Sequence, residues 1–251
     1  VPDVYHGAPT SVTAFVGTAP KIAAVVFAFR ILVTGLGTNF EDWSQMLAIL
    51  AVASLLVGNL AAIMQTNIKR MLAYSTISHM GFILLAFMAG AVGFAAGLYY
   101  AITYAVMSAV GFGVLMVLSN ETIECEDIKD LAGLNQRHAW YSFLMLLCMF
   151  SMAGIPPLMG FYAKFAVIKA LLLQGYVGLS VFAVIMSLIG AFYYLRVVKT
   201  IYFDEADHDQ PVGGNYAVKF VLTVNALLLL LWGIMPQTVI DWCAAALNNT
   251  L

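Results

Sequence analysis

The feature that most constrains this chain is a series of seven long apolar stretches separated by short polar loops. They lie at residues 12–34, 45–65, 72–92, 94–119, 139–173, 176–202 and 218–235. A helix needs about 20 residues to cross the hydrocarbon core of a bilayer, so most of these stretches fit one crossing. Because lipid offers the backbone no hydrogen-bond partner, each stretch must satisfy its own backbone groups as a helix. We therefore predict an all-α membrane protein with about seven transmembrane helices.

The composition agrees with this class and excludes others. Hydrophobic residues make up 63% and charged residues 10% of the 251 residues, whereas soluble domains contain about 25% charged residues. A net charge of −2 leaves no basic surface for nucleic acid. Cys125, Cys148 and Cys243 are far apart and show neither disulfide-framework nor metal-ligand spacing. The chain begins at Val1 in the polar segment VPDVYHGAPT, and we expect it to be a fragment of a longer protein.

The fifth stretch is too long for one straight crossing and contains a double proline. Its central segment reads SMAGIPPLMGFYAKF, in which Gly154 and Gly160 bracket Pro156 and Pro157. Each proline removes a backbone donor and clashes with the preceding helical turn. A proline kink that only shapes packing is one interpretation. The double proline between glycines favours two half-helices joined by an irregular linker at membrane depth.

Two lysines lie inside apolar stretches, where a charge is costly. Lys21 follows Pro20 about midway through the first stretch, and Lys164 follows the double proline in the fifth. A lysine at the centre of a membrane helix costs about 2.5–3.5 kcal/mol on insertion scales. Snorkelling to the membrane surface is the alternative, but it works best near helix ends. We interpret both lysines as cavity-facing groups that bind and release protons.

His79, in YSTISHMGF, is a third candidate relay residue. Histidine titrates near neutral pH and could pass protons between the two lysines. A structural histidine, hydrogen-bonded to a neighbouring helix, is an equal alternative. All thirteen carboxylates fall in loops or tails, so the apolar stretches offer the lysines no acidic partner. Either the lysines work through water alone, or their partner lies on a part of the protein outside this chain.

The basic residues predict the orientation. With seven crossings, the N-terminal segment and the loops after the second, fourth and sixth stretches share one side. That side holds Lys69, Arg70, Lys129, Arg137, Arg196, Lys199 and Lys219, and the other side holds Arg30 and Lys169. By the positive-inside rule, the first side is cytoplasmic and the C-terminus faces outward.

Some polar side chains are assigned to the membrane surfaces. Arg196 lies about seven residues from the end of its stretch, and we expect it to reach the cytoplasmic surface by snorkelling. Tyrosines are typical of the belts at both interfaces. We assign to these belts, with a place in a wet cavity as the lesser alternative, Tyr99, Tyr100, Tyr193, Tyr194 and Tyr202.

Five blocks of the sequence carry a family resemblance. In chain order they are VPDVYHGAPT, TAPK, QTNIKRMLAYSTISHMGF, MAGIPPLMGFYAKF and YYLRVV. They resemble the antiporter-like membrane subunits of bacterial NADH–quinone oxidoreductase, respiratory complex I. Within this family, the residues of VPDVYHGAP and QTNIKR are most similar to those of the subunit N branch.

The resemblance implies a fold of about fourteen helices with two inverted five-helix repeats, each containing a broken helix. Residues 1–251 would then be one transmembrane domain, the second half of that fold. Its parts would be a loop at 1–11, the last helix of the first repeat at 12–34, the second repeat at 45–202 and the final helix at 218–235. The helix broken at Pro156-Pro157 would belong to the second repeat, as interrupted helices do in many transporters.

The resemblance also implies roles for single residues. Lys21 matches the family's central lysine, which connects the two halves. Lys164 matches the lysine thought to hand protons towards the outer side, and His79 would join the hydrated axis. The family's glutamate and its further lysine would precede Val1, on the N-terminal half of the same subunit.

The function implied is that of a proton-translocating subunit of NADH:quinone oxidoreductase in the bacterial inner membrane, with a periplasmic C-terminus. Protons would move through buried lysines and water, coupled to electron transfer in other subunits. The expected partners are the other membrane subunits of complex I, the missing N-terminal half and the lipid bilayer. We expect no cofactor and no metal on this chain, because NADH, FMN, iron–sulfur clusters and quinone would belong to other subunits.

Two alternatives stay open. The same blocks would suit a subunit of a multisubunit Na⁺/H⁺ antiporter, for which transport would depend on sodium. The chain could also be a structural scaffold without its own proton path. Replacing both lysines by methionine would then leave pumping intact.

Overall fold

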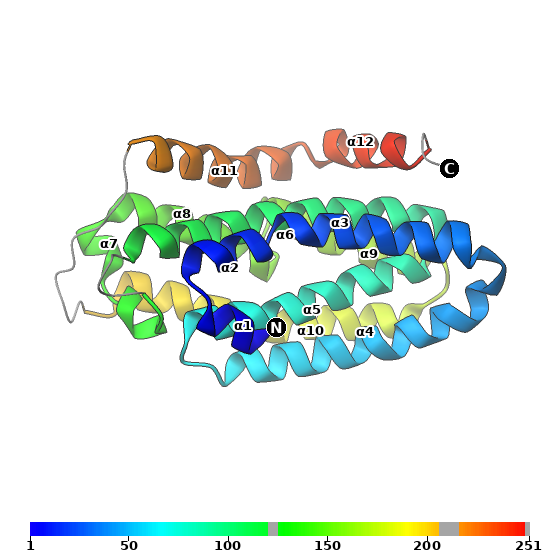
Figure 1. Ribbon diagram of the computed structural model, residues 1–251, viewed down its shortest axis with the longest axis horizontal. Helices are drawn as coiled ribbons and strands as arrows, with labels where there is room; N and C mark the ends of the chain where they lie inside the picture. Colours follow the sequence, from blue (N-terminus) through cyan, green and yellow to red (C-terminus); the bar gives the residue numbers. More distant parts are fainter. Residues whose placement is uncertain (120–124, 206–215, 249–251) are drawn as a thin grey trace.

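The computed structural model describes residues 1–119, 125–205 and 216–248, and these residues are mostly helical. The long helices run side by side along one direction, so that their connections gather at the two ends of the bundle (Figure 1). The long helices are α4 (Phe40–Ile63), α5 (Ile68–Met88), α6 (Gly90–Leu118), α10 (Val177–Phe203) and α11 (Tyr216–Ile234). The shorter ones are α1 (Pro2–Gly7), α2 (Thr10–Val16), α3 (Ala19–Phe29), α7 (Leu134–Arg137), α8 (Ala139–Ala153), α9 (Met159–Leu173) and α12 (Pro236–Asn248).

Six apolar helical segments of the described chain are long enough to cross a membrane. They are Thr10–Gly35, Gly37–Ile63, Ile68–Met88, Gly90–Leu118, Val177–Phe203 and Tyr216–Ile234. The half-helices α8 and α9 supply a seventh crossing between them. The prediction of an all-α membrane protein with about seven transmembrane helices, one of them broken, is confirmed.

The broken helix is interrupted where the double proline predicts. Helix α8 ends at Ala153 and is followed by Gly154, whose φ of 87° is left-handed and whose N–H donates to the carbonyls of Phe150 and Ser151. Glycine reaches this conformation at little cost, which explains its place at the end of a helix. Helix α9 then begins beyond the prolines and crosses close over α8. A Cβ on Gly160 would clash with the carbonyl oxygen of Ser151, so the crossing requires a glycine there.

The first predicted stretch is also interrupted, which the sequence analysis did not anticipate. Helix α2 stops at Val16, and α3 begins at Ala19 after a short turn at Gly17 and Thr18. Pro20 has no N–H to offer the carbonyl of Val16, four residues earlier, so a continuous helix cannot form across this point. Lys21 consequently lies in the first turn of α3, beside the interruption.

Helices α5 and α6 form the centre of the bundle, and α4 packs closely along α5. Small residues make this approach possible. A Cβ on Gly58 would lie 2.6 Å from the backbone nitrogen of Ser78, and one on Gly81 would lie 2.9 Å from Leu55 Cγ. The resulting contact holds the polar residues of α5 in a fixed position inside the protein.

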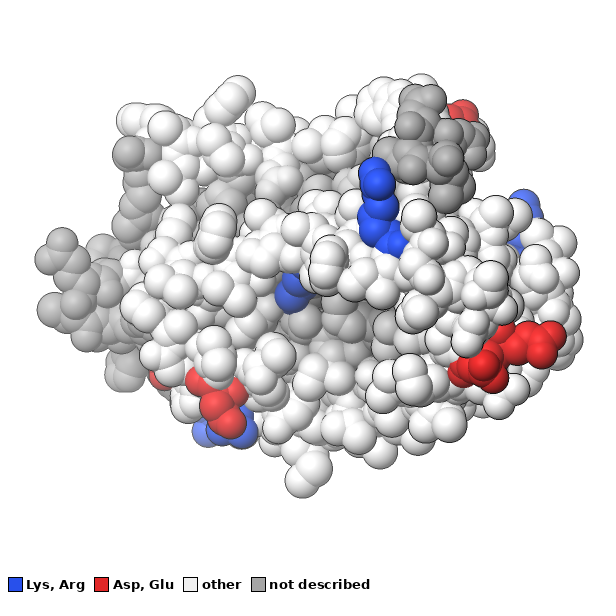
Figure 2. Space-filling view, turned by 45° about the vertical axis from the view of Figure 1, so that its right-hand side comes forward, with Lys and Arg blue, Asp and Glu red and all other residues white. Residues whose placement is uncertain are grey.

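The surface agrees with a membrane environment. In the space-filling view most of the visible face is uncharged, and the acidic side chains lie towards its two sides (Figure 2). Helix α12 continues roughly in line with α11 beyond the end of the last predicted stretch (Figure 1). It buries Val239 and Cys243 and leaves Trp242 exposed, which is the pattern of a helix lying on the bundle.

Candidate functional site

Lys164 sits against the break between α8 and α9. Its side chain is 7% exposed, and its ammonium group donates to the carbonyl oxygens of Met152 and Ala153 at 2.9 and 3.0 Å. A third hydrogen bond of 2.9 Å goes to Ser187 Oγ on α10. All three donors of this ammonium group therefore have partners inside the protein.

The double proline explains why these two carbonyls are free. In a continuous helix, the carbonyls of residues 152 and 153 would accept from the N–H groups of residues 156 and 157. Pro156 and Pro157 have no N–H, so both acceptors stay open at the end of α8. The unpaired carbonyls at a helix C-terminus carry partial negative charge, which attracts a cation. The predicted link between the break and Lys164 is thus a direct contact.

Lys21 points into the bundle from α3. Its Nζ lies 3.2 Å from the hydroxyl of Tyr104 and 3.3 Å from Thr76 Oγ1, and it lies 4.5 Å from the centre of the Tyr104 ring. Thr76 and Tyr104 are also hydrogen-bonded to each other. The lysine therefore contacts α5 and α6 through two hydroxyl groups and an aromatic face, and its cavity-facing role stays a prediction.

His79 lies between these two lysines in a fully packed position on α5. Its Nδ1 is 2.8 Å from the hydroxyl of Tyr100 on α6, and its Nε2 is 2.9 Å from that of Tyr194 on α10. Tyr194 continues the network to Ser75 Oγ. These bonds to two other helices are what a structural histidine would make. They also suit a relay residue, because both ring nitrogens have a hydrogen-bond partner.

A small cavity separates His79 from Lys164. It has a volume of about 10 Å³ and is lined by both residues, and also by Asn59, Ser187 and Gly190. A space of this size holds about one water molecule when polar groups line it. The structure therefore gathers Lys21, His79 and Lys164 in the core. The rings of Tyr104 and His79 lie 4.9 Å apart, and the water-sized cavity lies between His79 and Lys164.

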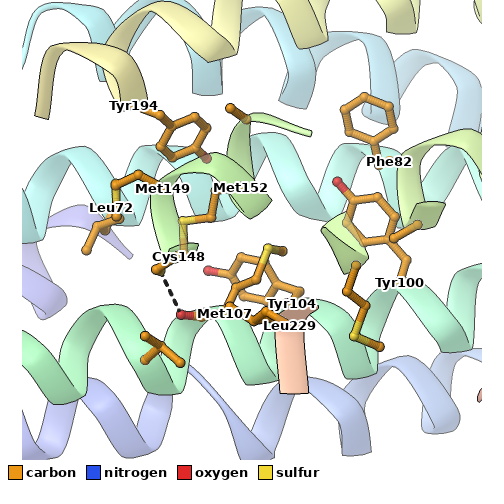
Figure 3. Close-up of a cluster of buried hydrophobic side chains, with 14 of the residues drawn as sticks. Leu72, Phe82, Tyr100, Tyr104, Met107, Cys148, Met149, Met152, Tyr194 and Leu229 are labelled. Carbon is orange, nitrogen blue, oxygen red and sulfur yellow. Dashed lines mark hydrogen bonds between the residues drawn. The ribbon is translucent and has the colours of Figure 1, made fainter. Parts of the chain in front are cut away.

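The tyrosines of this path were wrongly assigned to the interfacial belts. Tyr99, Tyr100, Tyr193 and Tyr194 are buried, and only Tyr202 among the five keeps partial exposure. Figure 3 shows Tyr100, Tyr104 and Tyr194 among the methionines of the core. Their place near the middle of long apolar stretches, away from the ends, is the sequence signal that could have indicated burial.

One basic residue differs from its predicted place. Lys69, assigned to a cytoplasmic loop, is fully buried at the start of α5 and lies 2.9 Å from Glu126 Oε1. Arg196 keeps partial exposure, and its guanidinium group donates to the carbonyls of Ile63 and Gln65 at 2.9 and 2.7 Å, at the end of α4 that leads into the loop before α5. It satisfies the open carbonyls at the end of α4, which a sequence alone does not reveal.

No group of three His, Cys, Asp or Glu side chains gathers among the described residues. Their buried polar groups are instead hydroxyl groups, two lysines and a histidine. Side chains of these types can both donate and accept protons.

Comparison with known proteins agrees with this geometry. Residues 1–190 match the family described as "NADH:quinone oxidoreductase/Mrp antiporter, TM". A relative from Neisseria gonorrhoeae, "NADH-quinone oxidoreductase subunit N", is 81% identical over 252 aligned residues that cover 100% of this chain and 52% of the relative. The chain spans about half the length of the curated relatives that it matches.

Solved structures show the same fold. A chain of respiratory complex I from Thermus thermophilus superimposes with a TM-score of 0.83 at 30% identity, covering 96% of this chain and 53% of that one. A chain of the Mrp complex from Dietzia gives a TM-score of 0.87 at 19% identity, covering 98% of this chain and 54% of that one. At that identity the second likeness concerns the fold alone.

Proposed function

Because the chain belongs to the NADH:quinone oxidoreductase/Mrp antiporter transmembrane family, we propose that it translocates protons as part of a subunit of a respiratory NADH:quinone oxidoreductase. It is a multi-pass membrane protein of the bacterial inner membrane, as its family and its apolar helices indicate. Electron transfer on other subunits would supply the energy, and the redox cofactors would lie on those subunits.

The observation that carries the proposal is the contact between Lys164 and the end of α8. An ammonium group that is 7% exposed within a membrane segment is rare without a function. The ammonium group of Lys164 donates to two carbonyl groups that the double proline leaves without a helical partner, so the break in the helix provides the acceptors for this lysine. A group held in this way can keep its position while it gains and loses a proton.

The route we propose begins at Lys21 and ends at Lys164. A proton leaving Lys21 passes to the hydroxyl groups of Thr76 and Tyr104, with which the lysine is in contact. His79 follows on the same helix as Thr76, and its ring lies 4.9 Å from that of Tyr104. The water-sized cavity then joins His79 to Lys164. Each residue accepts one proton as it gives up another, and the hydroxyl groups and the His79 ring must then reorient before the next proton can pass.

The finer arrangement is part of the proposal. The chain would be one transmembrane domain, the second half of a fourteen-helix subunit whose N-terminal half supplies the acidic partner. Other membrane subunits of the complex and the lipid bilayer would surround it. Because basic residues are concentrated at the ends of α4, α6 and α10 that lead into loops on one side, that side would be cytoplasmic and the C-terminus periplasmic.

The test is Lys164→Met in the full-length protein within the intact complex. Lys169→Met is the matched control, because Lys169 is on the same helix α9 but exposed. Proton pumping and quinone reduction would be measured in membrane vesicles, with complex assembly checked on native gels. We expect Lys164→Met to lower pumping while the control and the assembly stay normal. Normal pumping in Lys164→Met would favour a scaffold, and pumping that requires sodium would favour a Na⁺/H⁺ antiporter.

A further inference from the structure

An ion pair between a buried lysine and a half-exposed glutamate lies at one end of the bundle, apart from the path between the two lysines. Lys69 is fully buried in the first turn of α5, and its ammonium group lies 2.9 Å from Glu126 Oε1. The same group donates to the carbonyl oxygen of Ala8 at 3.3 Å. Removing a lysine from water costs several kcal/mol unless such partners compensate. The pair therefore forms where the segment before α2 meets the start of α5.

Backbone pairing holds Glu126 in this place. Asn67 and Asp127 form an antiparallel bridge, the N–H of Ile68 donates to the Glu126 carbonyl at 2.7 Å, and that of Ile128 donates to Thr66 at 2.9 Å. These bonds tie the segment after residue 124 to the loop between α4 and α5. Glu126 is thus fixed opposite Lys69 by the main chain, which most surface carboxylates are not.

The carboxylate of Glu126 faces both the interior and the surface. While Oε1 contacts the buried lysine, Oε2 lies 3.8 Å from Nε2 of His6. The side chains of Glu126 and His6 are 39% and 41% exposed. These two groups can therefore exchange protons with water outside the bundle.

Tyr5, which precedes His6 in the chain, lies next to Lys21 of the candidate site. Tyr5 is buried, its ring packs edge-on against Phe112, and the ring centre lies 5.3 Å from Lys21 Nζ. The Tyr5 hydroxyl is buried beside Lys21 and Thr76 but makes no hydrogen bond of regular geometry with them or with the other described residues. Such a group costs about 1–3 kcal/mol, so its presence beside a lysine calls for an explanation.

Helix α5 links the same two places along its length. Lys69 and Thr76 are seven residues apart, which puts them on one face of the helix and separates them by about 10 Å. Thr76 accepts a hydrogen bond from Lys21. Lys69 of the ion pair therefore lies two helical turns before Thr76, on the same face of α5 as this partner of Lys21.

We propose that Glu126, His6 and Tyr5 form the proton inlet to Lys21. A proton from outside water is taken up by Glu126 or His6 and is carried to the Tyr5 hydroxyl by water between them. This hydroxyl gives its own proton to Lys21 as it receives the new one. Lys69 is a positioning residue that holds the Glu126 carboxylate in place. The inlet rests on the proposed function, because it supplies the lysine from which that path begins.

Tyr5→Phe in the full-length protein is the most informative variant. It keeps the ring that packs against Phe112 and removes only a hydroxyl that forms no hydrogen bond of regular geometry, so a structural role predicts unchanged or higher stability. The inlet predicts that proton pumping falls by about tenfold while the complex still assembles. Glu126→Gln should lower pumping in the same way, and Glu126→Asp should retain part of it.

Asp3→Asn is the matched control. It removes the ion pair in which Arg70 on α5 lies 3.5 Å from Asp3 on α1, and it leaves Glu126 untouched. Normal pumping in this variant, together with slow pumping in Tyr5→Phe and Glu126→Gln, supports the inlet. If Glu126→Gln prevents assembly, Tyr5→Phe alone decides.

The outcomes separate the inlet from the function on which it rests. Normal pumping in Tyr5→Phe, together with loss of pumping in Lys21→Met, overturns the inlet and keeps the proton path. Normal pumping in both Lys21→Met and Lys164→Met overturns the proposed function, and the inlet with it.

Discussion

The ammonium group of Lys164 and the carbonyl oxygen of Met152 are 2.9 Å apart, although the two residues belong to different half-helices. The carbonyl is open because the residue four positions later is Pro156, which has no N–H. A feature that usually only bends a helix has here created an acceptor for a buried cation. The double proline and the lysine are therefore one functional unit, and neither is expected to work without the other.

The first prediction concerns this unit. Replacing Pro156 and Pro157 together by alanine returns two N–H groups that compete with Lys164 for the carbonyls of Met152 and Ala153. We expect assembled complex with pumping reduced by about tenfold, equivalent to a barrier about 1.4 kcal/mol higher. Pumping would be measured in vesicles by a pH-sensitive dye. Pro236→Ala is the control, because Pro236 is at the first position of α12, where an N–H has no helical partner.

The second prediction concerns the cavity between His79 and Lys164. A Cβ on Gly190 would lie 3.0 Å from Asn59 Oδ1 and 3.5 Å from the Tyr193 hydroxyl, so Gly190→Ala intrudes on a space that holds about one water. We expect slower pumping with an unchanged level of assembled complex. Gly178→Ala, on the same helix, adds a methyl group in open space and should pump normally. Equal pumping in the two variants would show that the cavity lies off the proton path.

The third prediction separates the two interpretations of His79. His79→Gln keeps a hydrogen-bonding side chain between Tyr100 and Tyr194 but cannot exchange a proton between two ring nitrogens. A relay predicts low pumping with normal thermal stability of the complex. A structural histidine predicts the reverse, with lower stability and normal pumping in the fraction that assembles. Tyr202→Phe, at the partly exposed end of α10, should change neither quantity.

The sequence predicted much of the fold because the bilayer imposes strong rules on a chain of this kind. The lengths of the apolar stretches predicted the crossings within a few residues, and Pro156 with Pro157 predicted the broken helix. The interruption before Lys21 was not predicted, because a single proline inside an apolar stretch is compatible with a helix that is kinked but continuous. The helix stops because Pro20 has no N–H to donate to the carbonyl of Val16. That consequence is clear only once the structure shows where α2 ends and α3 begins.

The candidate site was predicted in part, for a similar reason. Lys21, Lys164 and His79 were identifiable because charge and imidazole are rare at membrane depth. Tyr104 and Tyr194 were not, since a tyrosine suits either an interface or a core, and its neighbours on other helices decide between them. The pair of Lys69 and Glu126 was missed because both residues lie at the edges of loops, where charges are normally solvated.

The last prediction concerns the close contact of α4 with α5, which positions the polar residues of α5. A Cβ on Gly58 would lie 2.6 Å from the Ser78 backbone nitrogen, so Gly58→Ala must push the two helices apart. Overpacking of this kind costs about 1–3 kcal/mol of the free energy of unfolding. We expect a lower midpoint of thermal unfolding in detergent, and slower pumping because His79 follows Ser78 on α5. Gly178→Ala is again the control, and an unchanged midpoint for Gly58→Ala would mean that this contact is looser than the structure shows.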